Sequence, residues 1–326
     1  MDVCYFGTPD YSRALLWELS KHHRIVCVIS NPDSISDRSR KWKPSPVSEL
    51  ALEQGWKLLR PQKLKDPEFL EEFFSNKYDI GIVFSYGKIL PKELLEIPKY
   101  GILNLHGSLL PDLRGASPLQ TAIMKGYTKS GWTLQKVSEK MDEGDIVAQV
   151  AFEIQEEETT GELLQRVLPL GIELVLEVLG DLERYLLKSR KQDPSLATYC
   201  YKITDEVSRI DWKKSSQEIH NLIRALNPNP IAHTTLKKHD SQEIFPIKIY
   251  RSRWKMEPEI QRLLEPHSHD EEGKIVFLKY QKKNRIFVKT SDGWIEILEL
   301  QYPNKKILNA HDFVNGKFIQ EGEKFI

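Results

Sequence analysis

An asparagine and a histidine stand two positions apart at the end of an apolar run, residues 101–106. Side chains alternate between the two faces of a strand, so Asn104 and His106 point to one face and Leu103 and Leu105 to the other. The glycine that follows ends the predicted strand. An amide donor beside an imidazole can stabilise and protonate a carbonyl that becomes tetrahedral. The alternative is structural, with an asparagine cap and a half-buried histidine bonded to a loop.

An acidic turn further along the chain supplies a candidate third group. Asp142 lies in residues 141–145 (MDEGD), where it is followed by two further acids and a glycine. Such acids are common turn formers, which is the structural alternative. A carboxylate beside His106 would orient the imidazole ring and stabilise the imidazolium. Asn104, His106 and Asp142 would then be donor, acid and orienting group around one reacting carbonyl.

Other kinds of catalytic site have no sequence support in this chain. Ser108 follows the histidine but lies in no G-x-S-x-G turn, so it is not predicted to be a nucleophile. No HExxH or paired-histidine pattern predicts a metal site. Residues 7–10 follow the first strand but form neither a GxGxxG nor a Walker A loop. The residues therefore favour direct transfer of an acyl unit to an amine, without a metal or a covalent enzyme intermediate.

The first half of the chain alternates short apolar runs with stretches of helical apolar spacing. Strands are predicted at residues 3–6, 25–30, 57–60, 80–85, 102–105, 132–137 and 146–154, and helices at 11–21, 47–54, 67–76 and 160–187. This alternation is typical of an α/β fold with a doubly wound, mostly parallel, Rossmann-like sheet. Ligands bind such sheets beyond the carboxyl ends of the strands, which is where the histidine falls.

The length of 326 residues favours two domains. The predicted boundaries are a catalytic domain at 1–187, a polar, turn-rich linker at 188–206 and a second domain at 207–326. Short strands separated by turns recur in the second domain, at residues 245–250, 274–278, 285–289 and 294–300. That spacing is typical of a small antiparallel β-barrel of the OB type.

Charge and cysteine content bear on partners and compartment. Residues 207–326 carry 21 Lys and Arg against 16 Asp and Glu, although the whole chain carries 47 of each. The excess of five positive charges favours an anionic partner such as nucleic acid, with a solvated surface as the alternative. Three scattered cysteines indicate a reducing compartment, and no apolar run predicts a signal peptide or a membrane span. We therefore expect a cytoplasmic protein with no membrane partner.

Taken together, the motifs resemble those of the formyltransferase family that uses 10-formyl-tetrahydrofolate. The resemblance rests on residues 104–111 (NLHGSLLP), 114–118 (RGASP) and 141–145 (MDEGD). Further motifs are similar to those of the branch that formylates methionyl-tRNA: 6–10 (FGTPD), 43–47 (KPSPV), 85–91 (SYGKILP), 210–212 (IDW) and 223–228 (IRALNP). The resemblance extends over nearly the whole chain.

The resemblance implies an enzyme that formylates methionyl-initiator tRNA for translation initiation, with 10-formyl-tetrahydrofolate as co-substrate and no metal. It implies that Asn104, His106 and Asp142 are the catalytic trio. The folate-binding residues that it implies are Ser108, Leu109, Leu110, Pro111, Tyr86, Ile89 and Leu90. The loop at 31–46 is similar to a tRNA-binding insertion, and the residues expected to contact tRNA there are Arg38, Arg40, Lys41, Trp42 and Lys43. Cations at phosphates and an aromatic ring at a base suit that role.

Three other functions remain open from the residues alone. An N-formyltransferase acting on an amino sugar or another small amine would use the same trio and the same donor. A hydrolase that releases formate from the folate would also share it. A non-catalytic RNA-binding protein would have no need for Asn104, His106 and Asp142 together. We expect a monomer.

Overall fold

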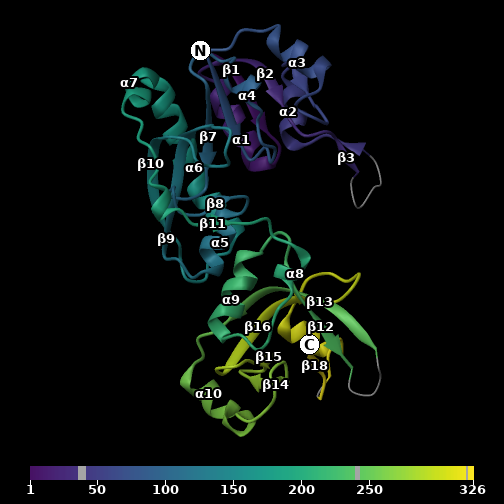
Figure 1. Cartoon of the computed structure of the whole chain (residues 1–326). Coiled ribbons are helices and arrows are strands. Elements are labelled where there is room, and N and C mark those ends of the chain that lie inside the picture. The colour runs from purple at the N-terminus through teal and green to yellow at the C-terminus, as the bar shows by residue number, and fades with distance from the viewer. Residues whose placement is uncertain (36–41, 239–242, 321) are drawn as a thin grey trace. The chain divides into compact units, whose positions relative to one another are not determined.

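The computed structural model describes residues 1–35, 42–238, 243–320 and 322–326. The chain folds into two compact units (Figure 1). The first unit contains residues 1–118, 129–152 and 166–201, and the second contains residues 119–128, 153–165 and 202–326. Asn104, His106 and Asp142 all lie in the first unit, as do residues 114–115.

The first unit is built on a seven-stranded sheet of order β10-β9-β7-β6-β1-β2-β5. Its strands are β1 (Asp2–Gly7), β2 (Arg24–Ile29), β5 (Leu58–Leu59), β6 (Ile80–Phe84), β7 (Ile102–His106), β9 (Lys129–Lys136) and β10 (Ile146–Glu153). Neighbouring strands from β5 to β7 are parallel, and β9 runs antiparallel to β7. The predicted mostly parallel α/β sheet is confirmed.

Helices connect these strands, and those predicted at 11–21, 47–54 and 67–76 are present. The helices are α1 (Asp10–Ser20), α2 (Pro46–Glu53), α3 (Pro67–Phe74), α4 (Lys92–Leu95), α5 (Pro118–Met124), α6 (Thr160–Gly180) and α7 (Leu182–Leu187). Helix α2 begins where Ser45 accepts a hydrogen bond from the Ser48 N–H, and Asp66 caps α3 in the same way. The expected single helix at 160–187 is two helices, because the backbone leaves the helical region at Asp181.

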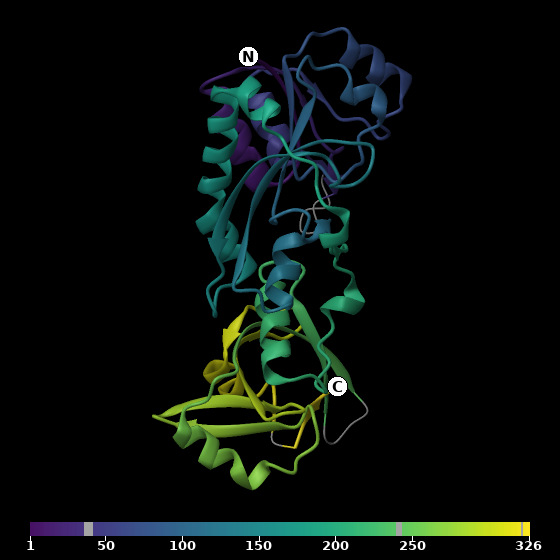
Figure 2. The same ribbon diagram turned by 60° about the vertical axis from the view of Figure 1, so that its left-hand side comes forward.

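Helix α6 packs closely on the apolar face of strands β7 and β9 (Figure 2). Trp132 is fully buried there and donates its indole N–H to the Val167 carbonyl at 2.8 Å. A Cβ added at Gly171 would lie 3.1 Å from the Trp132 ring and 3.2 Å from Leu105. This contact fixes which face of β7 is apolar, so the alternating Asn104 and His106 side chains face away from α6.

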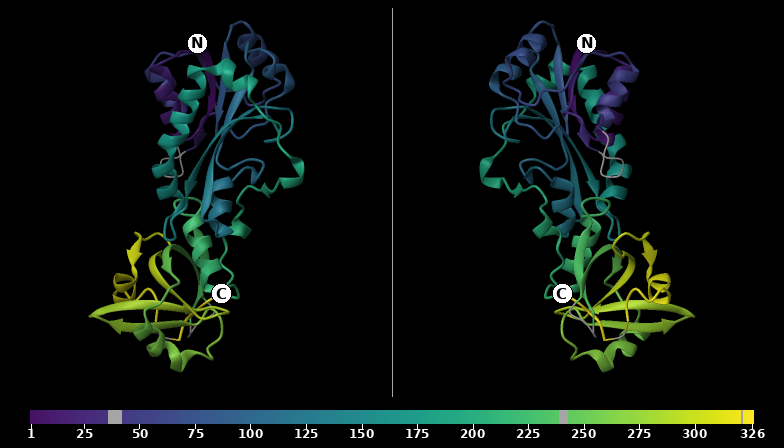
Figure 3. Two further views of the ribbon diagram at one scale, coloured as in Figure 1. Left: turned by 90° about the vertical axis from the view of Figure 1, so that its left-hand side faces the viewer. Right: turned by 90° about the vertical axis from the view of Figure 1, so that its right-hand side faces the viewer.

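The second unit is an antiparallel sheet of order β14-β15-β16-β13-β12-β18, with β17 beside β16 (Figure 3). Its strands are β12 (Ala232–Lys237), β13 (Ile244–Arg253), β14 (Ile275–Tyr280), β15 (Lys283–Lys289), β16 (Trp294–Gln301), β17 (Leu308–Asn309) and β18 (Lys324–Phe325). A bridge between Lys274 and Lys324 joins the two ends of this sheet. The predicted antiparallel C-terminal sheet is confirmed.

Helices α9 (Ser216–Ala225), α10 (Pro258–Leu264) and α11 (Ala310–Asn315) accompany this sheet, with the short 3-10 turn η2 (Glu265–His267). Helix α9 begins with a capping box in which Ser215 and Glu218 satisfy each other's backbone N–H groups. None of the helices in the described parts of the chain is long and apolar enough to cross a membrane.

The segment predicted as a linker has its own structure. It contains η1 (Pro194–Leu196), β11 (Tyr199–Cys200) and α8 (Asp205–Ser208), and β11 pairs in parallel with β8 (Arg114–Gly115). The first unit includes this segment as far as residue 201. A separate two-stranded hairpin is formed by β3 (Ser34–Ile35) and β4 (Trp42–Lys43). The domain boundaries at 187 and 207 stay a prediction.

Candidate active site

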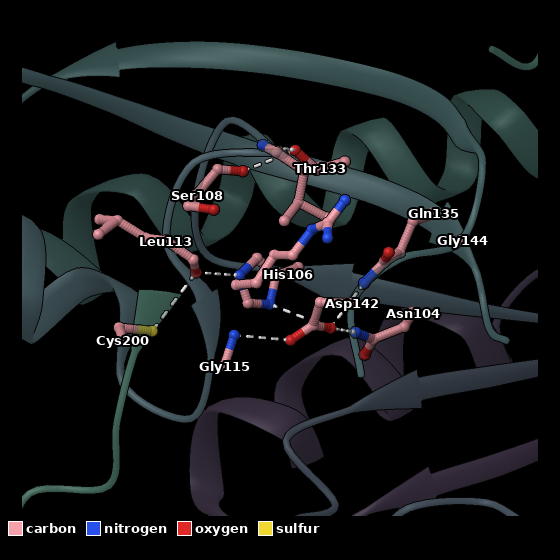
Figure 4. Close-up of polar contacts among 12 residues, drawn as sticks. Asn104, His106, Ser108, Leu113, Gly115, Thr133, Gln135, Asp142, Gly144 and Cys200 are labelled. Atoms are coloured by element: carbon pink, nitrogen blue, oxygen red, sulfur yellow. Dashed lines mark hydrogen bonds and ion pairs between the residues drawn. The ribbon is translucent and has the colours of Figure 1, made fainter. Parts of the chain in front are cut away.

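The carboxyl end of β7 brings two of the predicted catalytic side chains to one face of the sheet (Figure 4). Asn104 pairs with Gln135 and His106 pairs with Thr133 on the neighbouring antiparallel strand β9. His106 is buried and Asn104 is half-buried. The two groups therefore sit on a rigid element, a condition for precise placement of reacting groups.

Asp142 lies in the turn between β9 and β10, and its side chain points toward Asn104 and His106 (Figure 4). Its Oδ1 accepts from Gln135 Nε2 at 2.7 Å and lies 3.4 Å from Asn104 Nδ2. The same oxygen lies 3.6 Å from His106 Nδ1. Its Oδ2 accepts from the Gly115 N–H at 2.9 Å. The structure thus brings together the three residues that the sequence singled out.

The hydrogen bonds of His106 define which ring nitrogen faces the site. Nε2 lies 2.9 Å from the Leu113 carbonyl oxygen. A carbonyl oxygen can only accept, so Nε2 carries a proton and donates it to Leu113. Nδ1, the nitrogen nearest Asp142, is then the position at which a second proton is gained or lost. The backbone therefore fixes the tautomer, and Asp142 stands ready to hold the imidazolium.

Gly115 occupies a position that admits no side chain. Its φ is +121°, and an added Cβ would lie 2.0 Å from the Cys200 carbonyl oxygen. The close approach allows β8 to pair with β11 while the Gly115 N–H reaches Asp142. The glycine of the RGASP motif thus joins the strand pairing to the orientation of the carboxylate.

We expect Gly115→Ala to destabilise the protein and to lower kcat. The new methyl group would push β8 from β11 and move the N–H that Asp142 accepts. Gly55→Ala is the matched control, because Gly55 also has a positive φ, +68°, but open space around it. The control should cost only the backbone strain, about 1–2 kcal/mol. Thermal or urea unfolding measures the loss of stability in each variant, and initial rates at saturating substrate measure kcat. A loss of stability in Gly115→Ala that is equal to or smaller than that in Gly55→Ala would contradict the steric account.

The turn after β7 is anchored to the neighbouring strand. Thr133 Oγ1 donates to the Ser108 carbonyl at 2.6 Å and accepts from the Leu110 N–H at 3.1 Å. Ser108 is buried, and its hydroxyl donates to the Asp112 carbonyl. That bond occupies the hydroxyl within the turn, which agrees with the absence of a nucleophile elbow. Leu109 is half-buried, and Leu110 is buried.

The other predicted folate-binding residues, Tyr86, Ile89 and Leu90, lie partly in the core and partly at a cavity. Tyr86 is 1% exposed and packs against Phe6, with ring centroids 5.7 Å apart. Burial raises the pKa of the Tyr86 phenol, and its hydroxyl has no hydrogen-bond partner within the described residues. Ile89 is 61% exposed, and with the buried Leu90 it lines a cavity of about 630 Å³.

This cavity has a cationic wall. Four lysines and two glutamates line it together with apolar and amide side chains: Lys63, Lys65, Lys88, Lys92, Glu93, Glu139, Gln62, Leu64, Ile89, Leu90 and Pro91. Lys88 donates to the Pro61 and Gln62 carbonyls at 2.8 and 3.1 Å, and partial burial lowers the pKa of its amine. The cavity therefore combines an apolar side with an excess of positive charge.

The predicted tRNA-binding residues are only partly within the described structure. Trp42 is 70% exposed on β4, and Lys43 Nζ lies 3.5 Å from Glu49. Arg38, Arg40 and Lys41 lie outside the described residues. An exposed tryptophan is available to stack on a base.

Sequence reasoning missed the residues that hold the trio in place. Gln135 and Gln192 are buried amides, and Arg114 is a buried guanidinium. Arg114 Nε donates to Gln192 Oε1 at 3.0 Å, and Gln192 Nε2 donates to Gln135 Oε1 at 3.3 Å. Arg114 belongs to a motif that the sequence singled out, whereas the two glutamines carry no local signal. Among the described residues, no group of three His, Cys, Asp or Glu side chains could hold a metal ion. That the reaction needs no metal stays a prediction.

Comparisons with known protein families match both units. Residues 1–179 match the formyl transferase family, and residues 202–317 match the formyl transferase C-terminal domain. A methionyl-tRNA formyltransferase of Leptospira interrogans is 41% identical over 330 residues, which cover all of both chains. One from Fusobacterium nucleatum is 37% identical over 99% of both chains, and one from Bacillus subtilis is 33% identical over 98% of this chain and 96% of the relative.

Solved structures of similar fold are more distant in sequence. An N-formyltransferase from Helicobacter canadensis, in complex with folinic acid and dTDP-3-aminofucose, is 23% identical with a TM-score of 0.61. The match covers 92% of this chain and 98% of that chain. HypX from Aquifex aeolicus, in complex with tetrahydrofolic acid, is 19% identical with a TM-score of 0.62, and the match covers 98% of this chain and 48% of HypX. These likenesses show the shared fold.

Proposed function

Because the chain belongs to the methionyl-tRNA formyltransferase family, and so catalyses folate-dependent formylation of methionyl-tRNA for translation initiation, we propose how its residues perform that reaction. The donor in this proposal is 10-formyl-tetrahydrofolate, and the acceptor is the α-amino group of methionyl-initiator tRNA. Asn104, His106 and Asp142 act on the formyl group. The observation that carries the proposal is the Asp142 carboxylate, which lies within 3.6 Å of polar atoms of both partners.

In the proposed mechanism the unprotonated amine attacks the formyl carbon, and a new C–N bond forms. The carbonyl electrons move to oxygen, and the resulting oxyanion accepts hydrogen bonds from Asn104 Nδ2 and from protonated His106 Nδ1. The bond from the carbon to N10 of the folate then breaks, and the oxyanion collapses to the new amide. The proton lost by the attacking nitrogen passes to N10, with His106 and Asp142 as the nearest groups to relay it.

No enzyme nucleophile takes part in this scheme. The Ser108 hydroxyl is buried and donates to a backbone carbonyl, so the formyl group moves directly from the folate to the amine. Every side chain of the trio comes from one chain, and we therefore propose that a monomer suffices. Because the proposed acceptor is an aminoacylated tRNA, we propose that the enzyme is cytoplasmic.

We propose that the folate lies between the two predicted folate segments, with its apolar rings against Leu109, Leu110 and Ile89. Tyr86 is buried as a whole residue, so it would support the wall of this site by packing against Phe6. The cavity beside Ile89 and Leu90 would take the anionic glutamate end of the donor, because four lysines line it. Opposite charges in a partly enclosed site attract more strongly than they do in open water.

Transfer to two acceptors tests the proposed function. Purified protein and 10-formyl-tetrahydrofolate are mixed with methionyl-initiator tRNA in one reaction and with a dTDP-linked amino sugar in another. Formylation of the tRNA alone is the expected result. Formylation of the sugar alone would keep the chemistry but overturn the acceptor. Release of formate without either acceptor would indicate the hydrolase.

For tRNA binding we propose the loop residues Arg38, Arg40, Lys41, Trp42 and Lys43 together with cations of the second unit. Lys237 on β12 and Lys248 on β13 are exposed and make no ion pair with the residues that the structure describes. Both occupy positions that alternate with the buried residues of their strands, so both lie on the outer face of the sheet.

Neutralising this pair is expected to weaken tRNA binding and its dependence on salt. Each phosphate contact contributes about one unit to the slope of log K against log salt concentration. Lys237→Gln with Lys248→Gln should therefore reduce that slope by up to about two, in binding titrations across several salt concentrations. Lys77→Gln, an exposed lysine of the first unit, is the control. An unchanged slope in the double variant would remove these two lysines from the proposed interface.

A further inference from the structure

The segment from Arg190 to Cys200 wraps one side of the candidate active site, and we call these residues the strap. At its start, the Arg190 and Ile146 backbones exchange hydrogen bonds of 2.8 and 3.0 Å, which tie the strap to β10. Near its end, Thr198 Oγ1 accepts from the Leu113 N–H at 2.9 Å. The last residue, Cys200, pairs with Gly115. A segment held at both ends in this way is part of the framework of the site and is not a free linker.

One side chain of the strap reaches inward to the turn that carries Asp142. Gln192 is 9% exposed, and its Nε2 donates to the carbonyl oxygens of Asp142 and Gly144, both at 2.8 Å. Its Oε1 accepts from Arg114 Nε at 3.0 Å and from Arg114 Nη2 at 2.9 Å. The amide therefore uses both of its N–H groups and its oxygen in these contacts.

These contacts hold the Asp142 carboxylate in two ways, through the Asp142 backbone and through the Gly115 N–H. The backbone of Asp142 has a φ of +55°, a left-handed conformation that is uncommon outside glycine and that aspartate and asparagine adopt more readily than other residues. Gln192 holds the carbonyl of that residue directly. Through Arg114 it also holds β8, whose Gly115 N–H donates to the carboxylate. Movement at Gln192 would thus shift the carboxylate and its hydrogen-bond donor together.

We propose that Gln192 is a positioning residue for formyl transfer, which keeps the Asp142 carboxylate directed at Asn104 and His106. The proposal rests on the catalytic role of the trio proposed above. Gln192 does not touch the reacting atoms, and it acts through the turn at 142–144. Misplacement of a catalytic group by about 1 Å can cost about 10²-fold in rate, so a contact of this kind is expected to be visible in kcat.

Two substitutions separate this role from general support of the fold. Gln192→Met keeps the size of the side chain and removes every hydrogen bond. Gln192→Glu keeps an acceptor for Arg114, so the buried guanidinium retains its partner, but it presents no donor to the two carbonyls. Both variants are expected to lower kcat about 10- to 100-fold. The KM values for the folate and for methionyl-tRNA should stay within about twofold. Ser195→Ala, an exposed position on the same strap, should leave kcat unchanged.

A double-mutant cycle with Asp142→Asn tests the route through which Gln192 acts. If Gln192 works by directing the carboxylate, Gln192→Glu should cost less than about threefold when the carboxylate is already gone. An equal loss in both backgrounds would overturn the proposal, as would wild-type kcat in both Gln192 variants. Failure of the wild-type chain to formylate methionyl-tRNA would instead overturn the proposed function. The acceptor reactions with the wild-type chain measure that outcome separately from the Gln192 variants.

Discussion

Replacement of His106 by alanine is expected to lower kcat about 10²- to 10⁴-fold, the range of a general acid or base. The variant loses the Nδ1–H that would donate to the oxyanion and the group that would relay the proton. Binding of folate and tRNA should change little, because neither proposed binding surface depends on the imidazole. Initial rates at saturating concentrations of both substrates measure the loss.

The fold should tolerate this change. The Leu113 carbonyl loses its bond from His106 Nε2 but keeps the Cys200 thiol as a donor at 3.4 Å. His22→Ala is the matched control, because His22 is exposed after α1. Circular dichroism should give the same secondary structure for both variants. More than half of the wild-type kcat in a folded His106→Ala variant would remove the histidine from the mechanism.

Asp142→Asn should have an effect of similar size, about 10²- to 10⁴-fold on kcat. Asparagine tolerates the left-handed backbone at this position, so the substitution removes the charge with little change in shape. The amide cannot balance the charge of an imidazolium, and one of its ends presents N–H groups where Gln135 or Gly115 also donates. Single-turnover formylation of methionyl-tRNA measures the loss of the chemical step.

Two comparisons make this prediction specific. Asp181→Asn changes an exposed carboxylate between α6 and α7 and should keep full activity. The double variant His106→Ala with Asp142→Asn should be little slower than the slower single variant, because residues that act as a unit are not additive. A loss in the double variant equal to the product of the two single losses would indicate that His106 and Asp142 act separately.

Much of the fold follows from apolar patterns that are local in sequence. Each central strand is a continuous apolar run because helices cover both faces of the sheet, and such runs were recognisable without a partner strand. The break between α6 and α7 was missed because leucines continue on both sides of Asp181. Strand β11 was missed because it has two residues, and its partner β8 lies more than 80 positions earlier.

The candidate site was predictable to the extent that its residues share one element or one motif. Asn104 and His106 lie on one strand, and the period of two places them on one face. Asp142 was a candidate from the residues with a turn former as the alternative, and the resemblance to a known family favoured the catalytic role, because nothing local relates its turn to β7. Gln192 had no signal, since a buried amide in a polar segment looks like any surface glutamine until tertiary contacts form. The roles of all the predicted site residues remain proposals that the variants above test.

The most direct test of the account is the position of the formyl group in the site. A crystal structure of the protein with a stable 10-formyl folate analogue would give that position. The account predicts the pterin ring between residues 86–90 and 108–111, with the formyl oxygen within hydrogen-bond distance, about 3 Å, of Asn104 Nδ2 and on the Nδ1 side of His106. A formyl group bound beyond the reach of both side chains would contradict the proposed catalytic roles of the trio.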